Sequence, residues 1–187
     1  MNEMKMNNEK EIEALSFRLL EKRTVLLFGK VDEKKACEVI SAMLYLEDCD
    51  GEKPIILYIN SEGGAETDIL AIYDVMKKLR CPVETVCVGK AHGLSALVLA
   101  GGTKGSRKAY ANSEIMLSQV QRDRTFGQAS DIELETEHLL KVKERINGLL
   151  AALCQKDTAT IKNDLERKHW LFAEEAKAYG LIDEVIE

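Results

Sequence analysis

The sequence predicts an α/β protein of one domain, in which strands and helices alternate around a largely parallel sheet. Apolar runs typical of buried strands recur along the chain, and segments of about 10–15 residues with apolar side chains at helical spacing follow them. This alternation is typical of βαβ units. The 187 residues contain two prolines and no low-complexity tract, so no linker is expected to divide residues 1–187.

The first half of the chain shows the alternation most clearly. Its predicted elements are, in order, a strand at 23–31 (RTVLLFGKV), a helix at 33–47, a strand at 54–61 (PIILYINS), a helix at 65–79 and a strand at 83–89 (VETVCVG). Pro54 and the polar turn 61–64 bound the second strand. Both helices carry an apolar stripe suited to packing on the sheet.

The second half contains an unusual turn and a long helix. Residues 88–102, VGKAHGLSALVLAGG, are interpreted as the end of a strand that passes through Gly89 into a short helix. A strand follows at 114–119 (EIMLSQ), and then a helix at about 128–153. At ~1.5 Å per residue this helix spans on the order of 35–40 Å. Its glutamate-rich first half is therefore expected to project and meet a neighbour.

Composition excludes several classes of protein. A net charge of -6 without a basic patch argues against a nucleic-acid binder. No apolar run approaches the ~20 residues of a membrane span, and the polar N-terminus is not a signal peptide. The prediction is a cytoplasmic protein. The five cysteines lack metal-type spacing, so we expect reduced, mostly buried thiols, with no metal and no cofactor.

Several segments resemble a known family. They are, in order, LYINSEGG, AIYDVM, VGKAHGLSALVLAGG, KGSRKAYANSEIML, FGQASDIE and AEEAKAYGLIDEV. From about Leu20 to Asp183 the chain resembles the proteolytic subunit of the Clp protease, the ClpP family, within the wider ClpP/crotonase fold. The resemblance implies repeated β-β-α units with a long projecting helix.

The same resemblance locates a serine–histidine–aspartate triad in which every position is substituted. The serine position is Gly93, the histidine position is Ser118 and the aspartate position is Lys168. A glycine cannot form an acyl-enzyme, a serine is not a useful base near neutral pH, and a lysine inverts the charge that orients an imidazole. We therefore expect a catalytically inactive, ClpR-like member.

The oxyanion hole is expected to persist, because backbone N–H groups form it. The resemblance assigns its donors to Gly64 and Leu94, and Gly63 and Gly64 border a groove in which a peptide can add as a strand. Glu62 and Ser95 replace a proline and a glycine of the family pattern. Glu62 also adds a negative charge near a site for a carbonyl oxygen.

An active enzyme with a non-standard site is the alternative. Ser95 is one candidate nucleophile, although two residues of helix are ~200° of rotation away from Gly93. A Ser118–Lys168 dyad is another, because these positions should lie within hydrogen-bonding reach. His92 and His169 are expected to have structural roles. A crotonase-like acyl-CoA enzyme also uses paired N–H groups, but no glutamate stands at a defensible acid/base position.

The resemblance also implies partners. They are a heptameric or tetradecameric ring, homomeric or mixed with an active ClpP, an AAA+ unfoldase, and peptides. It assigns unfoldase docking to Tyr58 and ring contacts to four further residues, Gln128, Asp131, Glu166 and Arg167. Arg122, Asp123 and Arg124 replace glycines before the long helix, which predicts either a solvated loop or altered ring pairing. The N-terminal segment 1–18 is expected to be flexible or to line a pore.

Overall fold

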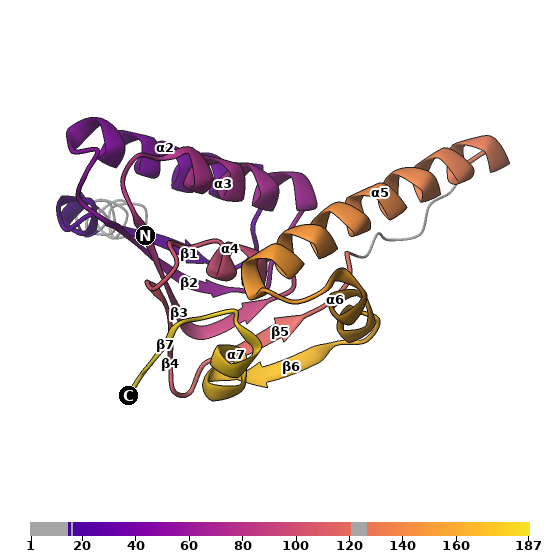
Figure 1. The fold of residues 1–187 in the computed structure, drawn as a ribbon. Helices are drawn as coiled ribbons and strands as arrows, with labels where there is room; N and C mark the ends of the chain where they lie inside the picture. The colour runs from indigo at the N-terminus through magenta and orange to yellow at the C-terminus, as the bar shows by residue number, and fades with distance from the viewer. Residues whose placement is uncertain (1–14, 16, 121–126) are drawn as a thin grey trace, which may run out of the picture.

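The computed structural model describes residue 15 and residues 17–120 and 127–187 as a seven-stranded sheet flanked by helices, which confirms the predicted α/β class (Figure 1). The strands are β1 (Thr24–Phe28), β2 (Ile55–Ser61), β3 (Val83–His92), β4 (Arg107–Tyr110), β5 (Glu114–Leu117), β6 (His169–Phe172) and β7 (Glu184–Ile186). The helices are α2 (Glu33–Cys49), α3 (Glu66–Lys78), α4 (Ser95–Ala100), α5 (Ala129–Cys154), α6 (Thr158–Leu165) and α7 (Ala173–Tyr179). The predictions for residues 122–124 and for most of 1–18 lie outside the described residues.

The sheet is parallel except at one end. Strands β1, β2, β3, β4 and β7 follow one another as parallel neighbours, while β5 pairs parallel with β3 and antiparallel with β6. Helices α2 and α3 lie together beside β1 and β2, and α6 and α7 lie at the other end near β6 (Figure 1). Within the described residues, no helix is long and apolar enough to cross a membrane.

Local chemistry accounts for the first strand and helix. In β1 Val25 and Leu27 are buried, whereas Leu26 and Phe28 are exposed on the opposite sheet face. The side chain of Asp32 then caps α2 by accepting a hydrogen bond from the Lys35 N–H at 2.8 Å. The capped helix packs its apolar stripe on the sheet.

Strand β3 is longer than predicted and contains an irregularity. Two consecutive pairs, Ile59 with Cys87 and Ser61 with Ala91, show that β3 holds extra residues at this point. Gly89 adopts φ +82°, and a Cβ there would lie 3.3 Å from the Asn60 side chain. The strand therefore continues beyond Gly89 to His92, and it changes its partner from β4 to β5 along the way.

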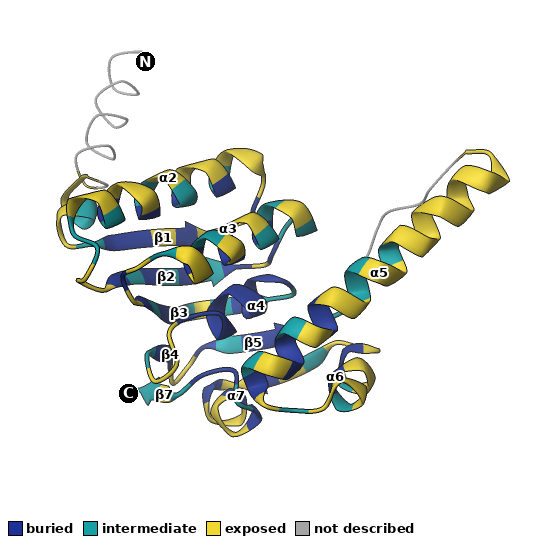
Figure 2. Ribbon diagram, turned by 45° about the horizontal axis from the view of Figure 1, so that its top comes forward, coloured by how far each residue is buried: buried dark blue, intermediate teal, exposed yellow. Residues whose placement is uncertain are grey.

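Helix α5 projects from the body as predicted. Its 26 residues span ~39 Å, and only its C-terminal part is buried (Figure 2). Ile146 and Leu150 anchor that part in the core, whereas residues 129–138 are exposed. A left-handed residue, Gln155 at φ +55°, ends the helix.

A buried ion pair joins the second half of the fold. Arg107 is 5% exposed, and its Nε and Nη2 donate to the two carboxylate oxygens of Asp183 at 2.9 and 2.6 Å. Its Nη1 donates to the carbonyls of Gly180 at 2.9 Å, Leu153 at 3.3 Å and Ala100 at 3.4 Å. The hydrogen bonds from Arg107 lower the pKa of Asp183 to about 2. This one side chain therefore links β4 to the ends of α4, α5 and α7.

The cysteines are free thiols, as expected, and three of the five are buried. Burial raises the pKa of Cys87 to about 12 and that of Cys154 to about 11, so both remain protonated. Cys37 and Cys49 are the two exposed thiols, both on α2, so most of the thiols are buried as expected.

Candidate functional site

The three triad-equivalent positions lie around one cavity. It has a volume of about 550 Å³ and opens where β2, β3 and β5 end. Gly93, Ser118 and Lys168 all line it. A Cβ built on Gly93 would lie 3.6 Å from the Ser118 Oγ, so the first two positions are direct neighbours. The convergence expected from the resemblance is therefore present in the fold.

The turn at Gly93 has the shape that an exposed nucleophile needs. Gly93 adopts φ +58°, and its N–H donates to the Met116 carbonyl at 2.8 Å. Helix α4 begins two residues later, at Ser95. A side chain at position 93 would point toward Ser118, but glycine supplies none.

The expected oxyanion donors face the same cavity. Gly64 and Leu94 both line it, and neither backbone N–H donates to another residue that the structure describes. Gly63, at φ +90°, brings the two turns together, because a Cβ on it would lie 3.4 Å from the Leu94 nitrogen. Two unpaired donors in one cavity are the arrangement that stabilises an oxyanion.

Packing alone explains why position 64 is a glycine. A Cβ on Gly64 would lie 1.8 Å from the Val31 carbonyl oxygen, because the two residues form a parallel bridge. Val31 donates its N–H to the Gly63 carbonyl at 2.9 Å and accepts from the Ala65 N–H at 3.3 Å. The glycine pair is thus required by the fold, whether or not the cavity performs chemistry.

Alanine substitutions at Gly64 and Gly93 should distinguish the cost in stability of a packing clash from that of backbone strain. We expect Gly64→Ala to lower the free energy of unfolding by about 3 kcal/mol or more, because backbone atoms must move. Gly93→Ala should cost only about 1–2 kcal/mol, since its Cβ has room and only the left-handed conformation is strained. Urea unfolding of both variants measures the difference. Equal losses would contradict the packing explanation.

Ser95 is not placed to act as a nucleophile. It is fully buried, and its hydroxyl donates to the carbonyl of His92 at 2.7 Å or of Ser61 at 2.9 Å. The predicted reason, rotation along a helix from Gly93, is wrong because α4 starts only at Ser95. The hydroxyl instead ties the end of β2 to the turn after β3.

The Ser118–Lys168 dyad lacks the expected contact. Both residues line the cavity, but no hydrogen bond joins them among the described residues. Lys168 is exposed, and Ser118 is half-buried. Without a base in contact, the Ser118 hydroxyl is not activated.

His92 and His169 are the sequence neighbours of Gly93 and Lys168, and both contact aromatic rings outside the cavity. The His92 ring packs edge-on against Trp170 with centroids 5.0 Å apart, and its Nε2 lies 3.0 Å from the Glu114 Oε1. His169 packs against Tyr179 at 5.6 Å. Neither histidine is among the residues that line the cavity.

Most of the charged residues that line the cavity were not predicted from the sequence; Glu62 and Lys168 are the exceptions. The missed residues are Lys30, Asp32, Glu66 and Asp68. Glu62 is exposed and pairs with Lys90 at 3.4 Å. Four carboxylates against two lysines disfavour the negative charge that an acyl-transfer transition state develops. These residues follow different strands, so no single motif revealed them.

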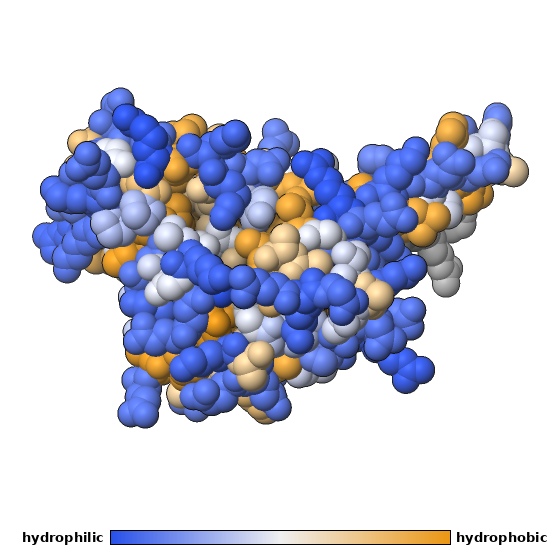
Figure 3. Space-filling view, viewed as in Figure 1, coloured by the Kyte–Doolittle hydropathy of each residue, from blue (hydrophilic) through white to orange (hydrophobic). Residues whose placement is uncertain are grey.

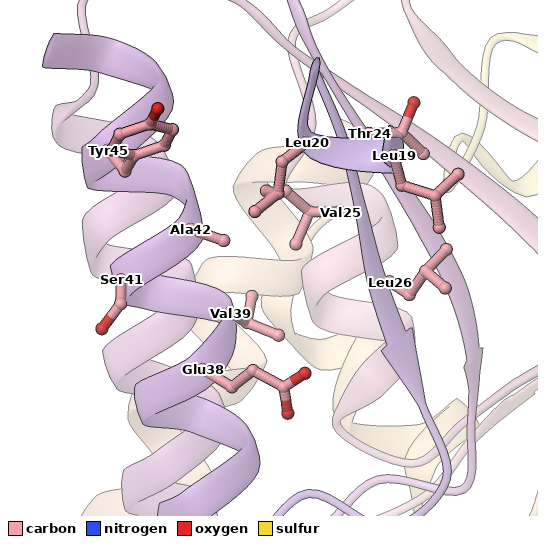
Figure 4. A pocket seen from close by; sticks show the side chains of 10 residues that line it. All are labelled: Leu19, Leu20, Thr24, Val25, Leu26, Glu38, Val39, Ser41, Ala42 and Tyr45. Carbon is pink, nitrogen blue, oxygen red and sulfur yellow. The ribbon is translucent and has the colours of Figure 1, made fainter. Parts of the chain in front are cut away.

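A second, more apolar cavity lies between α2 and β1 (Figure 4). It has a volume of about 460 Å³, and its lining includes Leu19, Leu20, Val25, Leu26 and Tyr45. The predicted docking residue Tyr58 does not line it but, on β2, is the register partner of Leu26.

Within the described residues, no group of three or more metal-binding side chains is suited to hold a metal ion.

The fold and the cavity define an α/β protein with a pocket that Gly64 and Leu94 line and in which the described lining residues include no serine–histidine pair. The Clp protease family model matches residues 7–187. The ATP-dependent Clp protease proteolytic subunit 1 of Thermobifida fusca (strain YX) is 40% identical over 169 residues, which are 90% of this chain and 76% of that protein. The chain belongs to the Clp protease family.

Proposed function

We propose that this chain is a non-catalytic subunit of a cytoplasmic, Clp-type proteolytic complex, acting in ring assembly or unfoldase docking. The observation that carries the proposal is the glycine at position 93. It leaves the turn beside Ser118 without a hydroxyl, and no hydrogen bond joins Ser118 to Lys168 among the described residues. The acidic lining of the cavity further disfavours catalysis at this site.

Exposed apolar side chains on two opposite faces support a ring. Phe28 and Tyr110 are exposed on the sheet face away from α2, and Leu26 on that face also lines the cavity beside α2. Leu44 and Tyr45 are exposed on α2 itself, on the other side of the sheet. Two different exposed apolar faces favour head-to-tail association of subunits. Such an association closes into a ring when the rotation from one subunit to the next allows it.

Stacking of two rings through the projecting helix is the second part of the proposal. Gln128 and Asp131 are exposed at the start of α5, and Glu166 and Arg167 are exposed just after α6.

The cavity between α2 and β1, beside Tyr58, would accept an apolar segment of an AAA+ unfoldase.

Peptide binding without cleavage is compatible with the cavity. The bridge to Val31 uses the Gly63 carbonyl and the Ala65 N–H, so the Gly64 N–H remains for an added strand. Titration with unlabelled peptides should then give saturable binding without products.

Native mass spectrometry of the chain alone and with an active ClpP tests the proposal. We expect heptamers or multiples of seven, with the chain entering mixed assemblies if an active partner is present. Turnover of peptides or acyl-CoA by the highly purified chain, without such assemblies, would contradict it.

A further inference from the structure

Gly64 leaves both of its backbone polar groups free beside the cavity at the ends of β2, β3 and β5. Its bridge to Val31 runs through its two sequence neighbours, because Val31 donates to the Gly63 carbonyl at 2.9 Å and accepts from the Ala65 N–H at 3.3 Å. Neither the N–H nor the carbonyl of Gly64 bonds to a residue that the structure describes. A free N–H and C=O on one residue are the groups with which a strand edge pairs a further backbone.

Asp68 places a carboxylate without a partner on the wall of the same cavity. It lies in the first turn of α3, four residues after Gly64, and it is half-buried. No hydrogen bond or ion pair joins its side chain to any residue in the described part of the chain. A negative charge is favourable at this end of a helix, but a carboxylate partly withdrawn from water is stabilised further by a cation.

The other charged residues of the lining do not supply that cation. Lys30 and Lys168 are exposed, and neither forms an ion pair with a described residue. Asp32 accepts a hydrogen bond that caps α2, and Glu62 pairs at 3.4 Å with Lys90, which does not line the cavity. The lining holds four carboxylates against two lysines. Its charge therefore favours a cationic ligand over an anionic one.

We propose that this cavity binds an extended peptide segment that carries a lysine or an arginine. A peptide carbonyl accepts from the Gly64 N–H, a peptide N–H donates to the Gly64 carbonyl, and the cationic side chain lies against Asp68. The cavity volume of about 550 Å³ accommodates such a side chain with its flanking backbone, and Gly93 adds no side chain to the space. The inference rests on the proposed peptide binding without cleavage and adds the class of peptide.

A series of three peptides tests the charge preference. The peptides are dye-labelled, share one neutral sequence and differ only at the central position, which is lysine, norleucine or glutamate; fluorescence anisotropy gives the three Kd values. We expect the lysine peptide to bind about fivefold tighter than the norleucine peptide, because a partly buried ion pair adds a modest attraction. The glutamate peptide should bind most weakly. The preference for lysine should shrink as the salt concentration rises.

Two substitutions at Asp68 assign the preference to this site. Asp68→Asn should bring the affinities for the lysine and norleucine peptides within about twofold of each other, because the ion pair is lost. Asp68→Lys should reverse the order, so that the glutamate peptide binds most tightly. A reversed preference cannot arise from a variant that merely fails to fold.

Asp74→Asn is the matched control. Asp74 lies on the same helix, is 60% exposed and does not line the cavity. The control is needed because the chain has a net charge of -6 and hydrophilic residues cover most of the face seen in Figure 3. A basic peptide is therefore also attracted by the surface as a whole. Asp74→Asn should leave the order and the ratios of the three affinities unchanged.

N-methylation of the lysine peptide gives a readout of the backbone contact. Methylating one peptide nitrogen at a time removes one donor at each position. At the position that pairs with the Gly64 carbonyl, we expect the affinity to fall about tenfold or more, because that carbonyl is then left without its donor. A peptide that tolerates methylation at every position would refute the backbone pairing.

The outcomes separate this inference from the proposed function. Equal affinities for the three peptides, or a preference for lysine that persists in Asp68→Lys, would overturn the cationic ligand and leave ring assembly untouched. Failure of every peptide to bind would overturn peptide binding together with this inference, whereas native mass spectrometry tests ring assembly by itself.

Discussion

Replacing Arg107 with methionine is expected to lower the free energy of unfolding by about 3–5 kcal/mol. The substitution keeps most of the aliphatic volume but leaves Asp183 as a largely buried charge without its partner. It also removes the donor for the carbonyls of Gly180, Leu153 and Ala100. Urea unfolding monitored by circular dichroism measures the loss.

Arg80→Met is the matched control. Arg80 also pairs with a carboxylate, that of Glu47 at 3.4 Å, but its side chain is 73% exposed. We expect a loss below about 1 kcal/mol, because exposed ion pairs contribute little. Similar losses for the two variants would contradict the role given to burial.

The pH profile adds a second readout for Arg107. The pKa of Asp183 is lowered to about 2 from its ordinary 3.8, so its ionised form stabilises the fold above about pH 4. That stabilisation is lost as the pH falls through about 2. The difference between wild type and Arg107→Met should therefore shrink over this interval.

Rebuilding the triad is the second change with a large expected effect. The triple variant Gly93→Ser/Ser118→His/Lys168→Asp should hydrolyse a fluorogenic peptide roughly 100-fold faster than the wild type. The turn can accept a side chain, since a Cβ at position 93 meets only Ser118 at 3.6 Å and the Glu62 carbonyl at 3.8 Å. The backbone N–H groups of Gly64 and Leu94, the expected oxyanion donors, donate to no residue in the described part of the chain.

Its control is the same protein with alanine at position 93. This variant has the base and the carboxylate but no nucleophile, so its activity should stay at the wild-type level. A gain in the alanine control equal to that of the serine variant would mean that another group attacks the substrate.

The strongest predictions from sequence concern elements with continuous apolar patterns. Strands β1 and β2 and helices α2 and α3 were predicted because their apolar side chains repeat with the period of the element. Two short strands, β4 (RKAY) and β7 (EVI), were missed. Helix α6 (TATIKNDL) was also missed, because it buries only Ile161 and Leu165.

Features that depend on distant segments were predicted least well. The end of β3 extends to His92 because β5 pairs with it, and no local pattern around Gly89 indicates that pairing. The meeting of Gly93, Ser118 and Lys168 was predicted only through the family resemblance.

The most direct measurement is active-site labelling of the wild-type chain with a fluorophosphonate probe, read out by peptide mass spectrometry and run beside the triple variant. We expect no adduct on any wild-type serine and an adduct on residue 93 of the triple variant. An adduct on Ser118 or Ser95 of the wild type, together with inhibitor-sensitive peptide hydrolysis, would show that the chain is an active hydrolase.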